Sequence, residues 1–590
     1  MAQKGKKTRL DSKSVGALPI VNHFLEKVHV QEVLTRFLPE KQGPGRRPKV
    51  PPEKVLLVLL RNLIVGRLAL YRIGEWARGH VPELFELTDA DLRGLDENRL
   101  GGALDLLYEA DRRGLITRVI REGVLAFKVK LRQIHNDTTT VSFFGKYEAH
   151  AFLGTVLLCR GHNKDHRPDL KQLVFSVSIS ADGDVPVHLG LFDGNKNDDQ
   201  IHCQIWDDLR EFVGGSDFIY VADSKLCTRT NLHHLDSQQG KFITVLPRTR
   251  KEDGQFRDWV QENQIHWDAE KKLPNPRNSE EPPHIFRVFE SRSRSSEGYR
   301  IIWVWDSLKA AHDALLRKEH VDDAVKDLEE LQGKIGTRNL KTREQVEEAV
   351  TKILVGRKAT PYITAHVDVE TVPRLKQARP GRPGAVTPYV RKSEEKVSLS
   401  WVENTGYIQW EAKTDGLFPL ITNIERDGRT GVARGRKRER EVGDEEFSPM
   451  RILEIYKYQP HVEKLHTMLK SVIRVMPVWL KSVRRIEALL SLVFIAQLIS
   501  TLVQRRLRLQ MKQRGIPALP LYPEAKKCKE PTARIILELY EPQRRHQLLA
   551  SKQVQQTFWD ELSPLQSEVL SLLDVDPRPY GHHRRTRSRK

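Results

Sequence analysis

The pattern of apolar and polar positions divides the chain into a helical start, a strand-rich middle and a helical end. Before residue 128 the periodicity is helical: two prolines precede an apolar run from Val55 to Val65, and a second apolar stretch follows a glycine. Beyond Met476 the pattern is helical again, with an amphipathic segment predicted from Arg484 to Arg508. We therefore predict helical domains at residues 1–128, as a DNA-binding domain, and 476–590.

The strand-rich middle begins at Leu131. Extended runs in residues 131–144, 171–180 and 185–193 are followed by a helical stretch, and an Asp-Gly turn signal separates the last two runs. An apolar run without alternation, FIYVAD, suits a strand covered on both faces. A helix and a further strand near Gly240 complete the order that is typical of a ribonuclease-H-like fold. We predict an α/β protein with this core in residues 129–248.

A large insertion is expected to interrupt this core, because the stretch before the last helical part is far longer than a helix crossover needs. A charged helical stretch from Leu308 to Ile353, broken at two glycines, lies among strand candidates. These candidates are residues 284–291, 299–307, 361–369, 395–402 and 406–413. We predict a β-containing insertion with a helical hairpin at residues 249–448 and a core helix at residues 449–475.

Four polar residues share a helical spacing within that core helix. Tyr456, Gln459, Glu463 and Lys470 stand at offsets 0, 3, 7 and 14. On a straight helix these offsets fall within roughly a 60° arc, so a carboxylate would project beside a cation and two polar groups. Pro460 is tolerated in a first helical turn but kinks an interior one, which leaves open that Tyr456 and Gln459 lie on a preceding turn.

Two other acids occur beside β-branched apolar runs, Asp137 in IHNDTTTV and Asp223 in FIYVADSK. Three carboxylates from separate segments can hold a divalent metal, and Mg²⁺ prefers oxygen ligands. Asp137, Asp223 and Glu463 are therefore candidate metal ligands. Glu454, in ILEIY, is the alternative third acid.

The spacing Tyr, two residues, a polar residue, three residues, Glu, six residues, Lys resembles the signature of bacterial insertion-sequence transposases of the DDE type. Residues 164–187 and 415–423 also resemble that family, and the resemblance spans roughly residues 131–499. Asp137 and Asp223 match the first and second acids of the family and Glu463 the third. The arginine of the signature is Gln459 here.

This resemblance implies a ribonuclease-H-like catalytic core in which those three acids are catalytic and hold two Mg²⁺ ions, which Mn²⁺ can replace. It also implies that Tyr456, Gln459 and Lys470 contact DNA. The expected activity is binding of the inverted repeats that end an insertion sequence, metal-dependent cleavage there, and transfer of the 3′-hydroxyl ends to target DNA. A homodimer that pairs two ends is expected.

Composition agrees with such a protein. Lys and Arg number 98 against 78 Asp and Glu, a net charge of +20 that favours a polyanionic partner, although a ribosomal or membrane-surface protein would have a similar balance. The four cysteines have no paired spacing, so neither a zinc cluster nor a disulfide framework is indicated. The apolar run at residues 486–499 is too short to span a bilayer. We expect a bacterial cytoplasmic, nucleoid-associated protein without a membrane partner.

Two alternative functions stay open. A ribonuclease-H-like nuclease would cut without strand transfer, and the large insertion and the face from Tyr456 to Lys470 disfavour it. A transposase-derived DNA-binding protein would lack activity. The presence of all three acids argues against that second alternative, and Gln459 keeps it open.

Overall fold

The computed structural model divides into two compact units, each described by itself. It describes residues 8–40, 49–66, 68–143, 156–161, 167–275, 281–337, 339–384, 387–430, 447–473, 482–550 and 553–581. Unit 1 comprises Met1–Thr244, Arg429–Arg440 and Glu454–Lys590, and unit 2 comprises Val245–Gly428 and Glu441–Leu453. The chain thus leaves unit 1 near the start of the predicted insertion and returns near its end.

Unit 1 contains a mixed sheet in the order β4-β3-β2-β5-β6. Its strands are β2 (Gln133–Phe143), β3 (Lys171–Ser180), β4 (Val185–Asp193), β5 (Ile219–Val221) and β6 (Lys241–Val245). β2, β3 and β4 are antiparallel neighbours, whereas β5 runs parallel to β2 and β6 parallel to β5. The helices α8 (His202–Val213) and α9 (Arg229–Ser237) precede β5 and β6. The protein is therefore of mixed α/β class.

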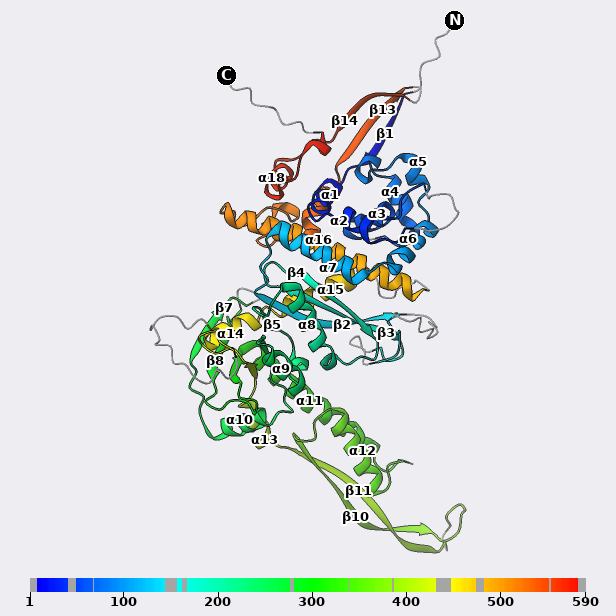
Figure 1. Ribbon diagram of the computed structural model, residues 1–590. Coiled ribbons are helices and arrows are strands. Elements are labelled where there is room, and N and C mark those ends of the chain that lie inside the picture. Colours follow the sequence, from blue (N-terminus) through cyan, green and yellow to red (C-terminus); the bar gives the residue numbers. More distant parts are fainter. Residues whose placement is uncertain are drawn as a thin grey trace. The chain divides into compact units, whose positions relative to one another are not determined.

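One long helix, α16 (Val483–Gln513), is the centre of the helical part of unit 1 (Figure 1). It contacts β4 and the helices α1 (Leu18–Lys27), α3 (Pro52–Val65), α6 (Glu97–Glu109), α7 (Arg112–Phe127), α17 (Ala533–Glu538) and α18 (Pro564–Leu573). By length and composition α16 could cross a membrane. However, 94% of its most apolar 18-residue stretch is buried inside the protein, as in a core helix. The amphipathic helix predicted here is wrong, because α16 is covered from several sides and so is buried all round.

The two terminal regions are not separate, wholly helical domains. Strand β1 (Thr8–Ser14) pairs antiparallel with β13 (Arg544–Ala550), which also pairs with β14 (Gln553–Trp559). The Tyr580 hydroxyl donates to the carbonyl of Gly16 at 2.9 Å. These strands were not predicted because their sequences are mostly polar and lack a clear apolar alternation. Residues 1–128 and 476–590 therefore build one structure together.

Unit 2 contains four antiparallel strands in the order β12-β9-β8-β7. They are β12 (Leu417–Thr422), β9 (Arg300–Asp306), β8 (His284–Glu290) and β7 (Ala269–Leu273). Phe256 of α10 (Lys251–Glu262) stacks on Trp303 of β9, with the ring centroids 3.7 Å apart. The predicted helical hairpin is present as α11 (Ser307–Lys334) and α12 (Arg343–Gly356). The strand predicted for residues 406–413 is instead a helix, α13 (Thr405–Ala412). The Asn404 side chain caps it by accepting from the Tyr407 amide at 3.0 Å, which favours a helix start over the strand preference of its aromatic residues.

Among the described strands, β10 (Ile363–Gln377) and β11 (Tyr389–Glu403) form a sheet of their own and pair antiparallel over their whole length. Near their base Val367, Val397 and Leu399 are buried against α11 and α12. Figure 1 shows the two strands continuing as a ribbon beyond α12. The sequence predicted only the packed base of this ribbon, where apolar side chains alternate.

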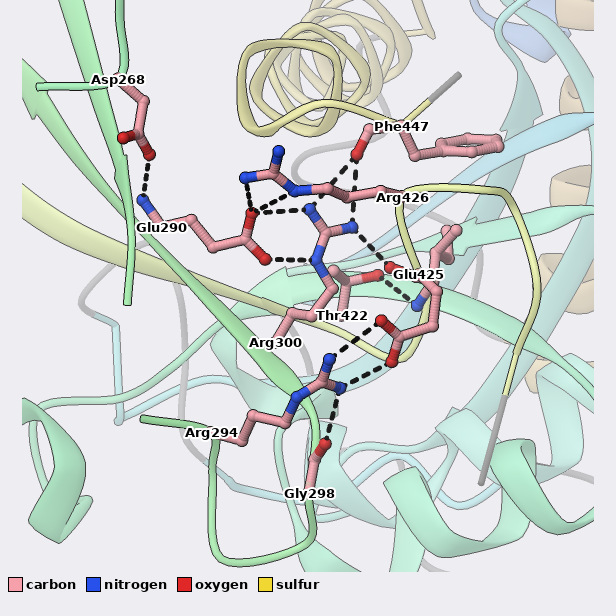
Figure 2. Close-up of polar contacts among 10 residues, drawn as sticks. Asp268, Glu290, Arg294, Gly298, Arg300, Thr422, Glu425, Arg426 and Phe447 are labelled. Atoms are coloured by element: carbon pink, nitrogen blue, oxygen red, sulfur yellow. Dashed lines mark hydrogen bonds and ion pairs between the residues drawn. The ribbon is translucent and has the colours of Figure 1, made fainter. Parts of the chain in front are cut away.

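A buried ion-pair network in unit 2 fixes the backbone on both sides of a long charged segment (Figure 2). The Arg300 side chain is 2% exposed. It donates to the Glu290 carboxylate at 2.7 and 3.1 Å and to the carbonyl oxygens of Ile424 at 2.7 Å and Phe447 at 3.3 Å. Arg426 donates to the same carboxylate at 2.7 and 2.9 Å. Because Phe447 lies two residues before α14 (Pro449–Tyr456), the network fixes the start of that helix.

Candidate active site

The first two candidate acids are neighbours at one edge of the unit 1 sheet. Parallel pairing of β2 with β5 aligns His135 with Val221, and Asp137 and Asp223 each lie two residues beyond that last aligned pair. Asp223 lies two residues beyond the carboxyl end of β5, where open α/β sheets usually place their sites. Its carboxylate accepts from the amide of Lys225 at 3.0 Å and so caps a short 3-10 turn. The sheet thus brings together two acids that are far apart in the sequence.

The third candidate acid comes from α15 (Pro460–Ile473), which packs against β2 and β3. Glu463 lies in the first turn of α15 and is exposed. One turn later His466 is buried, with its Nε2 3.7 Å from the Asp137 carboxylate. The packing of α15 therefore sets the turn that carries Glu463 alongside the strand that carries Asp137.

The negative charges of all three candidate acids act on the hydroxyl of Tyr456. Burial raises the pKa of the Tyr456 hydroxyl above its usual value, and the negative charges of Asp223, Glu463 and Asp137 raise it further. A phenol in this setting keeps its proton and can donate a hydrogen bond at any ordinary pH. Glu463 is thus one of the acids whose charge acts on this hydroxyl.

The four motif residues do not share one straight helix. Helix α14 ends at Tyr456 and α15 begins at Pro460, so the chain bends between them. Proline fits the first position of a helix because the amide hydrogen that it lacks would have no partner there. Placement of all four on one face is wrong, and the alternative with Tyr456 and Gln459 on a preceding turn is confirmed.

Gln459 is buried and hydrogen-bonds to two residues of β2. Its side chain is 5% exposed, its Oε1 accepts from Nδ1 of His135 at 2.9 Å, and its Nε2 donates to the carbonyl of Asn136 at 2.7 Å. Both ends of the amide are used inside the protein, which disfavours the predicted DNA contact by Gln459; that contact stays a prediction. Gln459 instead holds the two residues that precede Asp137.

His135 is held neutral by its burial. Burial lowers the pKa of His135 to about 4, although the hydrogen bond to Gln459 opposes that shift. Its Nε2 lies 2.7 Å from Nε2 of Gln133, and the tautomer with hydrogen on Nδ1 satisfies both ring contacts. The sequence carries no signal for this role, since the partners lie more than three hundred positions apart.

A second set of contacts holds the bend between α14 and α15. The Tyr458 hydroxyl donates to Asp184 at 2.5 Å, and Nδ1 of His461 lies 2.9 Å from the same carboxylate. Burial raises the pKa of Asp184, but the hydrogen bonds from His461 and Tyr458 outweigh it, so the pKa of Asp184 is lowered overall. Asp184 lies in the turn between β3 and β4, at a positive φ of 63°. The bend is therefore fixed to that turn and to β2.

Lys470 lies in α15, but its side chain is outside the described residues, so its DNA contact stays a prediction, as does that of Tyr456. The carboxylates of Asp137, Asp223 and Glu463 are the oxygen donors that Mg²⁺ prefers. Within the described part of the chain, however, no three His, Cys, Asp or Glu side chains stand close enough together to hold a metal ion. The chemistry of the donors fits Mg²⁺, whereas the three carboxylates would have to come closer together to share an ion.

Comparison with known proteins finds no protein-family model and no curated protein that matches the chain. Among solved structures the chain is similar to the piggyBac transposase in the cryo-EM structure of its synaptic complex with hairpin DNA. The TM-score is 0.27 at 10% sequence identity, and the match covers 48% of this chain and 60% of that chain. At these values the likeness carries no argument about chemistry.

Proposed function

We propose that this protein is a DNA transposase of the DDE type with a ribonuclease-H-like core. It binds the inverted repeats of its own insertion sequence, cleaves the ends and transfers the 3′-hydroxyls to target DNA as a homodimer. The observation that carries the proposal is the parallel pairing of β2, which carries Asp137, with β5, which leads to Asp223, together with the packing on β2 of α15, which carries Glu463. The strand order of the unit 1 sheet, three antiparallel strands followed by two parallel ones, supports such a core.

The residues suit phosphodiester chemistry. Bound Mg²⁺ would activate the attacking water and neutralise charge on the phosphate, and Asp137, Asp223 and Glu463 are the residues that would hold it. The protonated Tyr456 hydroxyl can donate to a phosphate oxygen. In cleavage a water oxygen bonds to phosphorus, the bond from phosphorus to the 3′-oxygen breaks, and that oxygen takes a proton. In transfer the 3′-hydroxyl loses its proton and its oxygen bonds to a target phosphorus, the bond from that phosphorus to the 3′-oxygen of the target strand breaks, and the released oxygen takes a proton.

The role of Gln459 bears on the alternative of an inactive, DNA-binding descendant. That alternative arose because glutamine replaces the arginine of the family signature. Since Gln459 is buried against β2, its lack of charge is no sign of a lost phosphate contact. The nuclease alternative, cleavage without strand transfer, would give different DNA products. The assay described below therefore distinguishes it from a transposase.

The test is an assay with a supercoiled plasmid that carries the DNA flanking the reading frame on both sides, in Mg²⁺ or Mn²⁺. Asp137→Asn, Asp223→Asn and Glu463→Gln should each slow cleavage by about a hundredfold or more, because metal ligands act mainly on the transition state. DNA affinity should change little. Asp217→Asn, at an exposed acid of the same unit, is the matched control and should cut normally.

Normal cutting by Asp137→Asn or Asp223→Asn would refute the proposal. Normal cutting by Glu463→Gln together with loss of cutting in Glu454→Gln would move the third acid to α14. Nicked or linear products without joined products would favour the nuclease.

A further inference from the structure

The outer half of the β10–β11 ribbon has no support from the other residues that the structure describes. From Asp368 to Lys396 every described residue is exposed except the half-buried Gln377 and Thr387. Leu375 is 66% exposed and Tyr389 is 53% exposed. A two-stranded hairpin alone is marginally stable in water. An outer ribbon of this length is therefore a surface suited to a partner.

The base of the ribbon, in contrast, is firmly held. Val367, Val397 and Leu399 belong to a buried cluster with Leu328 of α11 and Val350 of α12. Strand register continues without a break from this base to the tip. The ribbon is thus an arm, residues 368–396, whose base is packed against α11 and α12.

The tip of this arm is strongly basic. Residues 371–393 contain six Lys or Arg and no Asp or Glu. Arg374 stands directly opposite Lys392, and Lys376 opposite Val390, so three cations share one face. Glu394, just outside this stretch, pairs with Arg374 at 2.8 Å and with Lys376 at 3.8 Å, one acid for two cations.

Like charges directly opposite each other destabilise a strand pair, and an anionic partner removes that cost. The other face places Arg391 opposite Leu375 and Tyr389 opposite Gln377, so a cation projects on that side too. A two-stranded ribbon fits the major groove of B-form DNA, which is about 12 Å wide, with cations on both faces able to reach the phosphates of both strands.

We propose that the outer half of β10–β11 is an arm that binds double-stranded DNA through phosphate contacts from Arg374, Lys376, Arg391 and Lys392. This inference rests on the proposed function, which makes DNA the partner, and assigns to unit 2 a contact separate from the acids. The arm adds affinity to any duplex, because phosphate contacts carry no base sequence.

The test compares two full-length variants that lose the same charge. The arm variant changes Arg374, Lys376, Arg391 and Lys392 to Gln. The control variant changes the exposed Lys318, Lys326, Lys341 and Lys352 of α11, α12 and their connection to Gln. Binding to a fluorescent duplex is measured by anisotropy over a range of salt concentrations. Circular dichroism confirms that both variants are folded.

The arm variant should bind at least about tenfold more weakly than wild type, and its slope of log affinity against log salt should fall by about 0.9 for each lost contact. The control variant should match wild type in both. A shortened arm, in which Asn-Gly joins the cross-strand partners Thr371 and Glu395, should behave like the arm variant without placing new side chains on the ribbon.

Equal affinity and slope in wild type, arm variant and shortened arm would overturn the arm while leaving the proposed function standing. Normal DNA binding with loss of the dimer in sedimentation would also overturn it and make the arm a contact between copies of the chain. Absence of duplex binding by wild type would overturn both proposals.

Discussion

Replacement of Gln459 by alanine should loosen β2 without weakening DNA binding. The substitution removes the acceptor of the His135 Nδ1 hydrogen and the donor to the Asn136 carbonyl. Each buried polar group left without a partner costs about 1–3 kcal/mol. Some of this cost is recovered by water entering the vacated space, so we expect about 2–4 kcal/mol in all.

Hydrogen exchange of the β2 peptide, followed by mass spectrometry, measures this cost locally. A loss of about 2–4 kcal/mol corresponds to exchange roughly 30- to 900-fold faster, since about 1.4 kcal/mol is a factor of ten. Gln555→Ala, at an exposed position of β14, is the matched control and should leave the β2 peptide unchanged. Because Asp137 lies two residues beyond His135, cleavage and strand transfer should fall by about tenfold or less, equivalent to about 1.4 kcal/mol.

The opposite pattern would refute this reasoning. If Gln459→Ala lowered DNA affinity while the β2 peptide kept its protection, Gln459 would be a DNA contact. A variant Gln459→Arg that cut DNA when wild type did not would point to a decayed enzyme.

Two further predictions concern buried charge. The folded pKa of His135, about 4, lies below its usual 6.5, so the contribution of His135 to the free energy of unfolding should be full above pH 6.5. It should fall by up to about 1.4 kcal/mol per pH unit down to about pH 4. His135→Asn keeps a donor and should flatten that fall in unfolding measurements, and an unchanged pH slope would contradict this prediction. Arg300→Met should destabilise unit 2 by about 3–5 kcal/mol, because it leaves Glu290 and two carbonyls short of a partner. Faster exchange in the β9 peptide would show this, with the exposed Arg292→Met as control; equal exchange in both would refute it.

The strands beside the acids were predictable because their signals are local. Alternation and β-branched residues around Asp137, and the unbroken apolar run before Asp223, indicate strands without knowledge of any partner. The pairing that sets the two acids side by side depends on register between distant segments, which the sequence did not reveal except through resemblance.

The role of Gln459 was not predictable for a related reason. Helix-face geometry assumes a continuous helix, and Pro460 starts a new one whose direction depends on packing against β2 and β3. The burial of α16 likewise depends on helices from the first part of the chain. Charged residues near both ends of α16, at Arg484 and Arg508, led to the prediction of an amphipathic helix. The residues between these ends are buried on all sides.

The position of α16 late in the chain also affects the order in which parts of the protein can fold during synthesis. The helices α1, α3, α6 and α7 end by Phe127, yet the helix on which they pack is complete only at Gln513. A ribosome that adds about 5–20 residues per second takes roughly 20–80 s to cover that distance. During this interval the apolar faces of the first helices lack α16 as a partner. Unit 2 is fully synthesised at Leu453, before α16 begins, and can therefore fold ahead of the part of the protein that was made first.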